Sequence, residues 1–249
     1  MVDYHPYDGL ISGATSLTEK NISKIERLTE GKKSIKFAMI SDTQGWYDET
    51  NEVVNAINKR SDIDFVIHGG DQSDFGVTKE FIWMRDALQR LKVPYVCVIG
   101  NHDCLGNGEE VYKKIYGNDN FAFTAGDIRF ICLNTNALEY DYSHPVPDFV
   151  FLDSLKANFP KGAQKTVFAM HVKPTDFIFN NNVANIFERY VTSFPKTQFC
   201  LYGHNHSVSV DDVFGDGIIY YECASINKRS YLVFTIKEEG GYDYEVVTF

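Results

Sequence analysis

Five short apolar segments of this sequence are each followed at once by side chains that bind metal ions. These side chains are Asp42; Asp71 and Asp74; Asn101 and His102; His171; and His204 and His206. Carboxylate, imidazole and amide ligands in combination suit zinc, iron or manganese. The set is too large for one tetrahedral ion. Two ions that share a bridging carboxylate would use it, and a pair about 3.5–4 Å apart is an arrangement found in hydrolytic sites.

The densest of these clusters is Gly100-Asn101-His102-Asp103, directly after the apolar run Pro94–Ile99. A buried strand that ends in glycine and then presents three polar side chains is not extending a hydrophobic core. A polar loop with a capping Asn or Asp would explain this stretch if it stood alone. Four other predicted strands end in the same chemistry, so we interpret it as part of a site.

The spacing of the clusters indicates how the chain brings them together. Asp42 and Asp71 are 29 residues apart, and Asp71 and Asn101 are 30 apart. Each interval holds one predicted strand and one helix, which implies parallel strands with right-handed crossovers. The carboxyl ends of such strands meet at one edge of the sheet, where open α/β sheets bind ligands. The predicted elements are strands at 35–41, 63–68 and 94–99, and helices at 49–60 and 78–91.

The remaining chain alternates less regularly. Its long polar and aromatic loop, 135–147, carries Tyr140, Tyr142 and His144, and loops of this length are often functional. The predicted helices are 109–116, 148–159 and 183–191. The predicted strands are 121–124, 129–134, 166–170, 198–202, 207–214, 218–223, 231–237 and 242–248.

Each candidate ligand also has an ordinary structural explanation. A histidine at a strand end, such as His171, is often simply hydrogen-bonded in the core, and Asp42 could cap a helix. His204 and His206 alternate along an extended segment and could point to opposite faces. Together these explanations would require several unrelated coincidences, so the metal site is the favoured hypothesis. His5, His68 and His144 have no other candidate ligands near them in a motif, so for these three we keep the structural explanation.

Composition limits the classes of partner. With 44% hydrophobic and 23% charged residues among 249, the chain resembles an ordinary globular protein. Its formal net charge of −10 argues against long nucleic acid or an anionic membrane as a partner. The five cysteines match neither a zinc ribbon nor a disulfide framework, and four lie in apolar runs.

The domain organisation expected from the sequence is simple. Residues 1–33 are polar, with one short helix suggested by Ile22, Ile25 and Leu28, and should form an extension that packs on the core. Residues 34–249 contain no repeat or linker and should form a single domain. No apolar run is long enough to span a membrane. The chain is expected in the cytoplasm as it stands, or outside it if an export signal has been removed.

Five motifs in this order resemble those of the calcineurin-like metallophosphoesterases, over about residues 35–210. They are Asp42-x-Gln44, Gly70-Asp71-x-x-Asp74, Gly100-Asn101-His102-Asp103, a lone His171, and Gly203-His204-x-His206. Each motif is weak by itself, and the ordered set is specific. The resemblance implies an α/β fold, a four-layer α/β/β/α sandwich of mixed sheets, with metals at the carboxyl ends of the strands.

The resemblance also implies a role for each residue. Asp71 would bridge two divalent or trivalent metal ions, with manganese, iron and zinc all open. Metal-bound hydroxide would attack phosphorus in line, while His102 protonates the leaving oxygen and Asp74 orients His102. The implied partners of Asp71 are Asp42, Gln44 and His206 at one metal, and Asn101, His171 and His204 at the other.

Two departures from the family pattern bear on function. The first motif usually ends in histidine, where this chain has Gln44. The protein Ser/Thr phosphatases of the family continue the second motif with Arg-Gly, where this chain has Phe75-Gly76. The absence of that phosphate-gripping arginine disfavours a protein phosphatase.

The sequence therefore predicts a phosphoesterase that acts on a small phosphomonoester or phosphodiester. Trp46 and Tyr47, and in the middle of the chain Asn134, Asn136, Tyr140 and Tyr142, are candidates to select the substrate, although loop aromatics more often only pack. One rival is a non-catalytic metal- or phosphate-binding protein on the same fold. Another is a nuclease with a basic strip at Lys113-Lys114 or Lys228-Arg229.

Overall fold

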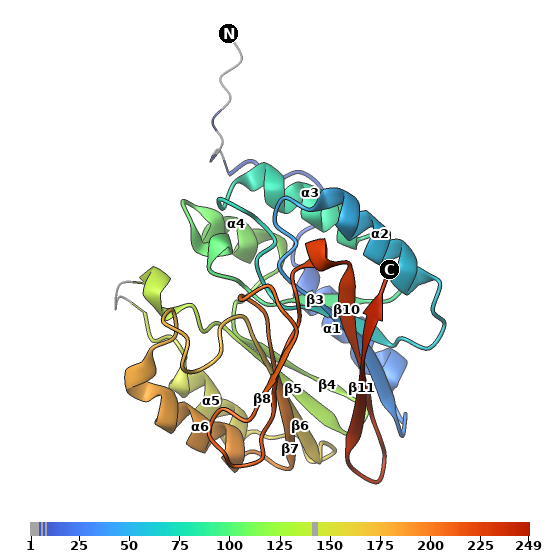
Figure 1. Cartoon of the computed structure of the whole chain (residues 1–249), viewed down its shortest axis with the longest axis vertical. Coiled ribbons are helices and arrows are strands. Elements are labelled where there is room, and N and C mark those ends of the chain that lie inside the picture. Colours follow the sequence, from blue (N-terminus) through green and yellow to red (C-terminus); the bar gives the residue numbers. More distant parts are fainter. Residues whose placement is uncertain (1–4, 6, 8, 141–143) are drawn as a thin grey trace.

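Two mixed β-sheets face each other in the computed structural model, which describes residues 5, 7, 9–140 and 144–249 (Figure 1). The strand order is β11-β10-β1-β2-β3 in the first sheet and β4-β5-β6-β7-β9-β8 in the second. The first sheet contains β1 (Ile35–Ile40), β2 (Phe65–His68), β3 (Tyr95–Cys97), β10 (Ser230–Ile236) and β11 (Tyr242–Thr248). The second contains β4 (Phe121–Ala125), β5 (Ile128–Leu133), β6 (Lys165–Met170), β7 (Thr197–Tyr202), β8 (Ser209–Asp211) and β9 (Tyr220–Glu222).

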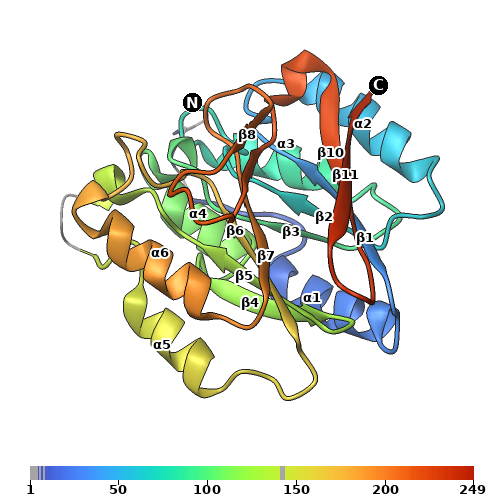
Figure 2. The same ribbon diagram turned by 60° about the horizontal axis from the view of Figure 1, so that its bottom comes forward.

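Helices cover the outer faces of both sheets, and the first helix of the chain lies at their edge against β3 and β4, as Figure 2 shows from a second direction. The α-helices are α1 (Leu17–Thr29), α2 (Tyr47–Asn58), α3 (Thr78–Leu88), α4 (Gly108–Ile115), α5 (Phe149–Ala157) and α6 (Ala184–Ser193). Short 3₁₀ turns occur at η1 (His102–Cys104), η2 (Ala137–Tyr140), η3 (Asn181–Val183) and η4 (Ile226–Lys228).

The alternation of side chains along each strand produces these layers. In β1, Phe37 and Met39 point into the core between the sheets, whereas Ala38 and Ile40 pack against the helices on the other side. A third cluster, which includes Phe187 of α6, fills the space outside the second sheet. The predicted α/β/β/α sandwich is therefore confirmed.

Aromatic rings fill much of the space between the sheets. The ring of Phe37 stacks on Phe65 and Phe234 of its own sheet at centroid distances of 5.3 and 5.4 Å. Phe130 of the second sheet meets Phe37 edge-on at 5.3 Å. Such pairs contribute about 0.5–1.5 kcal/mol beyond the burial of their area. This packing holds the two sheets in a fixed relation, and so fixes the loops that follow their strands.

The parallel strands of both sheets deliver their carboxyl ends to one region. β1, β2 and β3 are parallel to one another, as are β5, β6, β7 and β9. The loops after them are joined across the sheets, because Nδ1 of His171 is hydrogen-bonded to the carbonyl of Gly69 at 2.8 Å. The side chains predicted from distant parts of the sequence are thus brought together.

Several predicted elements are longer than those observed; the strands predicted at 94–99 and 218–223, for example, are only β3 and β9. The strand expected at 207–214 is only β8, because the Asp212 carboxylate accepts the N–H groups of Asp216 and Gly217 and folds the chain into a turn. The short helix expected near Ile25 is longer, as α1, and packs against β3 and β4. Tyr4 of the N-terminal segment lies outside the described residues.

The chain before α1 lies against α3 through a buried arginine. Arg85 is 2% exposed, and its guanidinium donates to the carbonyls of Ser12 and Ala14 at 2.5 and 3.2 Å. None of the helices in the described part of the chain combines the length and apolar character needed to cross a bilayer.

We expect Arg85→Met to loosen residues 9–16 because methionine keeps the buried stem but donates no hydrogen bond. Loss of the charged donor should lower the free energy of unfolding by about 2–3 kcal/mol. Limited proteolysis should then cut within 9–16 faster than in the wild type. Arg90→Met, at an exposed position just after α3, is the control. Equal cleavage in the two variants would contradict the anchoring role.

Candidate metal centre

Four of the predicted site residues adopt a backbone conformation that L-amino acids rarely use. Asp42, Asp71, His204 and His206 have φ angles of 51°, 59°, 82° and 61°. Non-glycine residues held in this left-handed region cost about 1–3 kcal/mol and cluster at functional sites. Each occurs just after a strand, where the turn redirects the side chain toward the space between the two sheets.

Asp103 holds the loop after β2 in this shape. Its carboxylate accepts six hydrogen bonds of 2.8–3.0 Å: from the backbone N–H groups of Asp71, Gln72, Ser73 and Gly100, and from the side chains of Gln72 and Ser73. Sequence reasoning included Asp103 in its motif but gave it no function. Its role is to fix the backbone that carries Asp71.

His68 supports the neighbouring loop and is not a ligand. Its Nδ1 accepts the N–H of Gly70 at 3.2 Å, so Nε2 carries the proton and donates to the Thr43 hydroxyl at 2.8 Å. Burial lowers the pKa of His68 to about 4, which keeps the ring neutral. The structural role expected for this histidine is confirmed.

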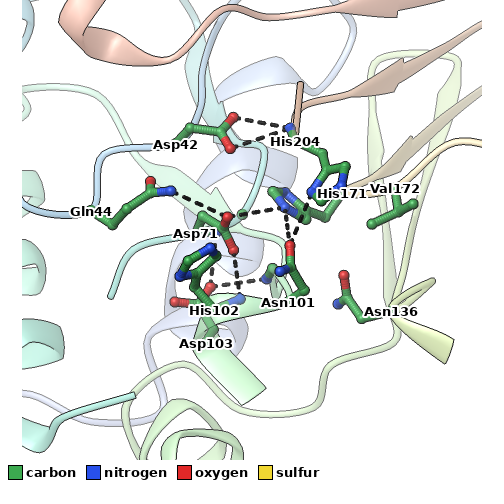
Figure 3. Close-up of polar contacts among 12 residues, drawn as sticks. Asp42, Gln44, Asp71, Asn101, His102, Asp103, Asn136, His171, Val172 and His204 are labelled. Atoms are coloured by element: carbon green, nitrogen blue, oxygen red, sulfur yellow. Dashed lines mark hydrogen bonds and ion pairs between the residues drawn. The ribbon is translucent and has the colours of Figure 1, made fainter. Parts of the chain in front are cut away.

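One half of the site is formed by Asp71, Asn101, His171 and His204. The Asn101 Oδ1 atom lies 3.1 Å from His171 Nε2 and 3.0 Å from His204 Nδ1, and His171 Nε2 lies 3.3 Å from Asp71 Oδ2 (Figure 3). Ligands that each lie about 2.0–2.2 Å from one ion are separated by roughly 3.0–3.5 Å. Gly70 permits this approach, since a Cβ there would lie 2.5 Å from His171 Nδ1. These four side chains therefore have the spacing of a ligand set.

The other half is formed by Asp42, Gln44, Asp71 and His206. His206 Nε2 lies 3.4 Å from Asp42 Oδ1, and Gln44 Nε2 lies 3.3 Å from Asp71 Oδ2. The Gln44 Oε1 atom is buried and has no hydrogen-bond partner among the described residues. Figure 3 shows Asp71 between Gln44 and His171, so its carboxylate faces both halves of the site.

The electrostatics of the site favour bound cations. Asp42 and Asp71 are almost fully buried, and no Lys or Arg of the described residues forms an ion pair with either. Burial by itself would lower the pKa of His171, but the carboxylates of Asp71 and Asp42 outweigh it and raise that pKa to about 10. The contact with Asp42 likewise raises the pKa of His206. The site thus attracts positive charge, and two metal ions would fit its donor atoms and its charge.

His102 lies beside the ligand sets. Its backbone N–H donates to Asp71 Oδ1 at 3.0 Å, and its Nδ1–H donates to the backbone carbonyl of Asp74 at 2.7 Å. The Asp74 carboxylate, predicted to orient His102, is farther away, with Oδ1 at 3.7 Å from Nδ1. The other ring nitrogen, Nε2, forms no hydrogen bond within the described residues, and the side chain is 38% exposed.

Two acidic residues near the site were not predicted. Asp176 Oδ1 lies 3.6 Å from His204 Nε2, on the side of the ring away from Asn101. Glu139 is half-buried, and this burial raises the pKa of its carboxyl group. The charge of Asp71 raises that pKa further, whereas His102 lowers it. Glu139 lies in the 3₁₀ turn η2 and Asp176 in an irregular segment, and neither local sequence has a metal-binding pattern, so only the fold reveals them.

Two of the predicted substrate-selecting residues, Asn134 and Asn136, are buried and donate hydrogen bonds within the fold. Asn134 donates to Asp119 and to the Tyr140 hydroxyl, and Asn136 donates to the carbonyl of Ile99, all from buried positions. Trp46 is exposed next to the first motif, whereas Tyr47 is partly buried against Trp83. Tyr142 lies outside the described residues.

Comparison with known proteins agrees with this geometry. A profile described as calcineurin-like phosphoesterase matches residues 35–208, which include every predicted site residue. A dimetal phosphatase from Danio rerio has a similar structure, with a TM-score of 0.63, 12% sequence identity, and coverage of 86% of this chain and 99% of that one.

Two curated relatives share parts of the sequence. A probable cyclic nucleotide phosphodiesterase of Xenorhabdus bovienii is 31% identical over 91 residues, which are 32% of this chain and 37% of that protein. A 3′,5′-cyclic-nucleotide phosphodiesterase of Nostoc is 24% identical over 154 residues, 59% of this chain and 57% of that protein. The matches thus span between about a third and just over half of the relatives.

We expect Asp103→Asn to destabilise the protein and to disturb the site. An amide offers one acceptor oxygen, and its NH₂ group would oppose N–H donors on the other side. Several buried donors would lose their partner, at about 1–3 kcal/mol each, so the free energy of unfolding should fall by on the order of 3 kcal/mol or more. Denaturant unfolding measures this, with the exposed Asp48→Asn as control. A change below about 1 kcal/mol would contradict the role given to Asp103.

Proposed function

The chain belongs to the calcineurin-like phosphoesterase family, and on this premise we propose that it hydrolyses a small phosphodiester with two metal ions bound around Asp71. One observation carries the proposal: Asp71 belongs to both groups of side chains whose donor atoms lie within 4.8 Å of one another, Asp71-His171-His204 and Asp42-Asp71-His206. A carboxylate common to two ligand groups is what a bridged pair of ions requires.

The two ligand sets differ in strength. Asn101, His171 and His204 would hold one ion with Asp71, and Asp42, His206 and Gln44 would hold the other. When bound, the ions supply Lewis acidity toward the phosphoryl oxygens and activate water as the nucleophile. Gln44 would contribute only a neutral amide oxygen, a weaker and harder donor than imidazole. Rotation of its amide by half a turn would bring the unpartnered Oε1 to the side of Asp71.

His102 is proposed as the general acid. Its Nδ1–H is engaged by the Asp74 carbonyl, so Nε2 is the ring atom that can hold the proton for the leaving oxygen. The bond from its N–H to Asp71 ties the acid to the bridging ligand. Asp74 would act mainly through its carbonyl, because its carboxylate lies farther from the ring, with Oδ1 at 3.7 Å from Nδ1.

The small-substrate proposal is supported by the surface charges. Lys113 is paired with Glu109, and Arg229 is paired with Glu52, so neither predicted basic strip offers its full charge to a phosphate backbone. This argues against a nuclease that acts on long chains. The diester preference is supported by the two curated relatives, both named as cyclic nucleotide phosphodiesterases.

We expect His102→Ala to retain metal and to lose turnover by about 10²–10⁴-fold, the usual contribution of general acid catalysis. The loss should be smaller for esters with good leaving groups, which need less protonation. Assays with bis(4-nitrophenyl) phosphate and 3′,5′-cyclic AMP, together with metal analysis, measure both effects. Asp74→Asn keeps the carbonyl and should lose much less.

The same assays address the non-catalytic rival. Stoichiometric binding of manganese or zinc without turnover of any mono- or diester would support a binding protein and contradict the enzyme. An equal loss for both esters in His102→Ala would contradict the acid role alone.

We expect wild-type protein to bind manganese or zinc with two separable affinities, since Gln44 is the weak member of one set. Gln44→His should tighten the weaker zinc site and leave the other unchanged, because imidazole is the better donor to zinc. Calorimetric titration of both proteins measures this, and Gln44→Ala is the matched variant that removes the amide. Two equal affinities that neither substitution alters would contradict unequal sites.

A further inference from the structure

A cavity of about 310 Å³ lies beside the proposed metal centre and is used by none of the steps above. Its walls come from η2, which contributes Leu138, from the segment 177–182 before α6, and from His144 and Val146. The backbone N–H of Leu138 donates to the carbonyl of Ile178 at 3.1 Å, which ties the two walls together. The volume is at the lower end of the range for small-molecule sites.

The cavity adjoins the centre through His204. The ring centroid of Phe177, a lining residue, lies 6.5 Å from that of His204, and Asp176 next to it lies 3.6 Å from His204 Nε2. His204 Nδ1 faces Asn101 on the opposite side of the ring. A group in the cavity would therefore be separated from the other proposed ligands by the imidazole ring of His204.

The lining combines exposed apolar side chains with neutral amides. Phe177 is 76% exposed and Leu138 is 58% exposed, although both are large and apolar. The amides of Asn180 and Asn182 also line the cavity, and within the described residues their side chains have no hydrogen-bond partner. No Lys, Arg, Asp or Glu is among the described residues that line it, and His144 is the one titratable side chain among them, so the lining is mainly uncharged.

We propose that this cavity binds the uncharged planar ring of the substrate, a nucleobase, while the phosphodiester lies at the metals; the proposal rests on the proposed function. Phe177 offers a ring face for stacking, and base–aromatic stacking contributes about 1–3 kcal/mol. The amides of Asn180 and Asn182 can each donate and accept, as the edge of a base requires. An alkyl chain would leave these amides without partners, and an anionic group would meet no Lys or Arg among the described residues of the lining.

Two measurements on the metal-loaded protein test the proposal. Phe177→Ala should raise KM for 3′,5′-cyclic AMP about tenfold and change kcat by less than about threefold, because stacking contributes to binding and not to the chemical step. Phe75→Ala is the matched control, since Phe75 is another exposed phenylalanine next to the site, beside Asp74. It should leave KM unchanged.

The second measurement needs neither phosphate nor turnover. Saturation-transfer NMR with adenosine and with uridine should detect nucleoside binding to the wild type and to Phe75→Ala, and a loss of signal for Phe177→Ala. Equal effects of the two substitutions on KM would overturn the proposal. Hydrolysis of bis(4-nitrophenyl) phosphate without nucleoside binding would overturn it while leaving the proposed function intact. Nucleoside binding without any hydrolysis would support the cavity and reject the proposed function.

Discussion

The constraint on which the site depends is the burial of two carboxylates, Asp42 and Asp71, whose ion-pair partners among the described residues are histidines and not Lys or Arg. A buried, unpaired carboxylate is costly, by several kcal/mol even after relaxation. The carboxylates in turn raise the pKa of His171 to about 10, which favours a positive charge beside them and offsets part of this cost. His171 Nε2, which faces Asp71, is also the atom proposed to bind a metal ion. Protons and metal ions therefore compete for one position, and metal affinity should weaken as the pH falls.

The buried carboxylates of Asp71 and Asp103 lie in neighbouring loops but differ in their hydrogen bonds. Asp103 has hydrogen-bond donors on both oxygens, six in all, and so needs no cation. Asp71 accepts from the His102 N–H and from Gln44, and its Oδ2 also faces the His171 ring. The first carboxylate is satisfied by the backbone that it shapes. The second is presented by that backbone to the side chains of both proposed ligand sets. The hydrogen bonds of Asp103 thus hold the loop rigid, and this leaves the carboxylate of Asp71 free to face the proposed metal ligands.

The sequence was sufficient to predict the fold and the positions that converge, because both follow from regular patterns. The intervals between Asp42, Asp71 and Asn101 each equal one strand–helix unit, and a parallel sheet brings such positions together. Asp176 could not be found in this way, since its place beside His204 depends on an irregular segment between β6 and α6. The strand predicted at 207–214 was too long because the apolar pattern does not reveal the side-chain hydrogen bonds of Asp212 that end it. The roles of the site residues remain predictions.

Because the net charge of the protein is −10, attraction of an anionic substrate and selection among substrates should depend on different parts of the molecule. An anionic ester approaching an acidic protein gains attraction only where cations are bound, so affinity for the phosphoryl group should depend on metal loading. Such attraction does not distinguish one phosphoester from another. Discrimination has to come from contacts with the uncharged part of the substrate, and these contacts are insensitive to the charge of the protein. The segment that carries Asp176 and Phe177 lies against His204 and also forms one wall of the neutral cavity. A substrate that fits the cavity would therefore be held in a fixed relation to a proposed metal ligand, and position as well as affinity would select it.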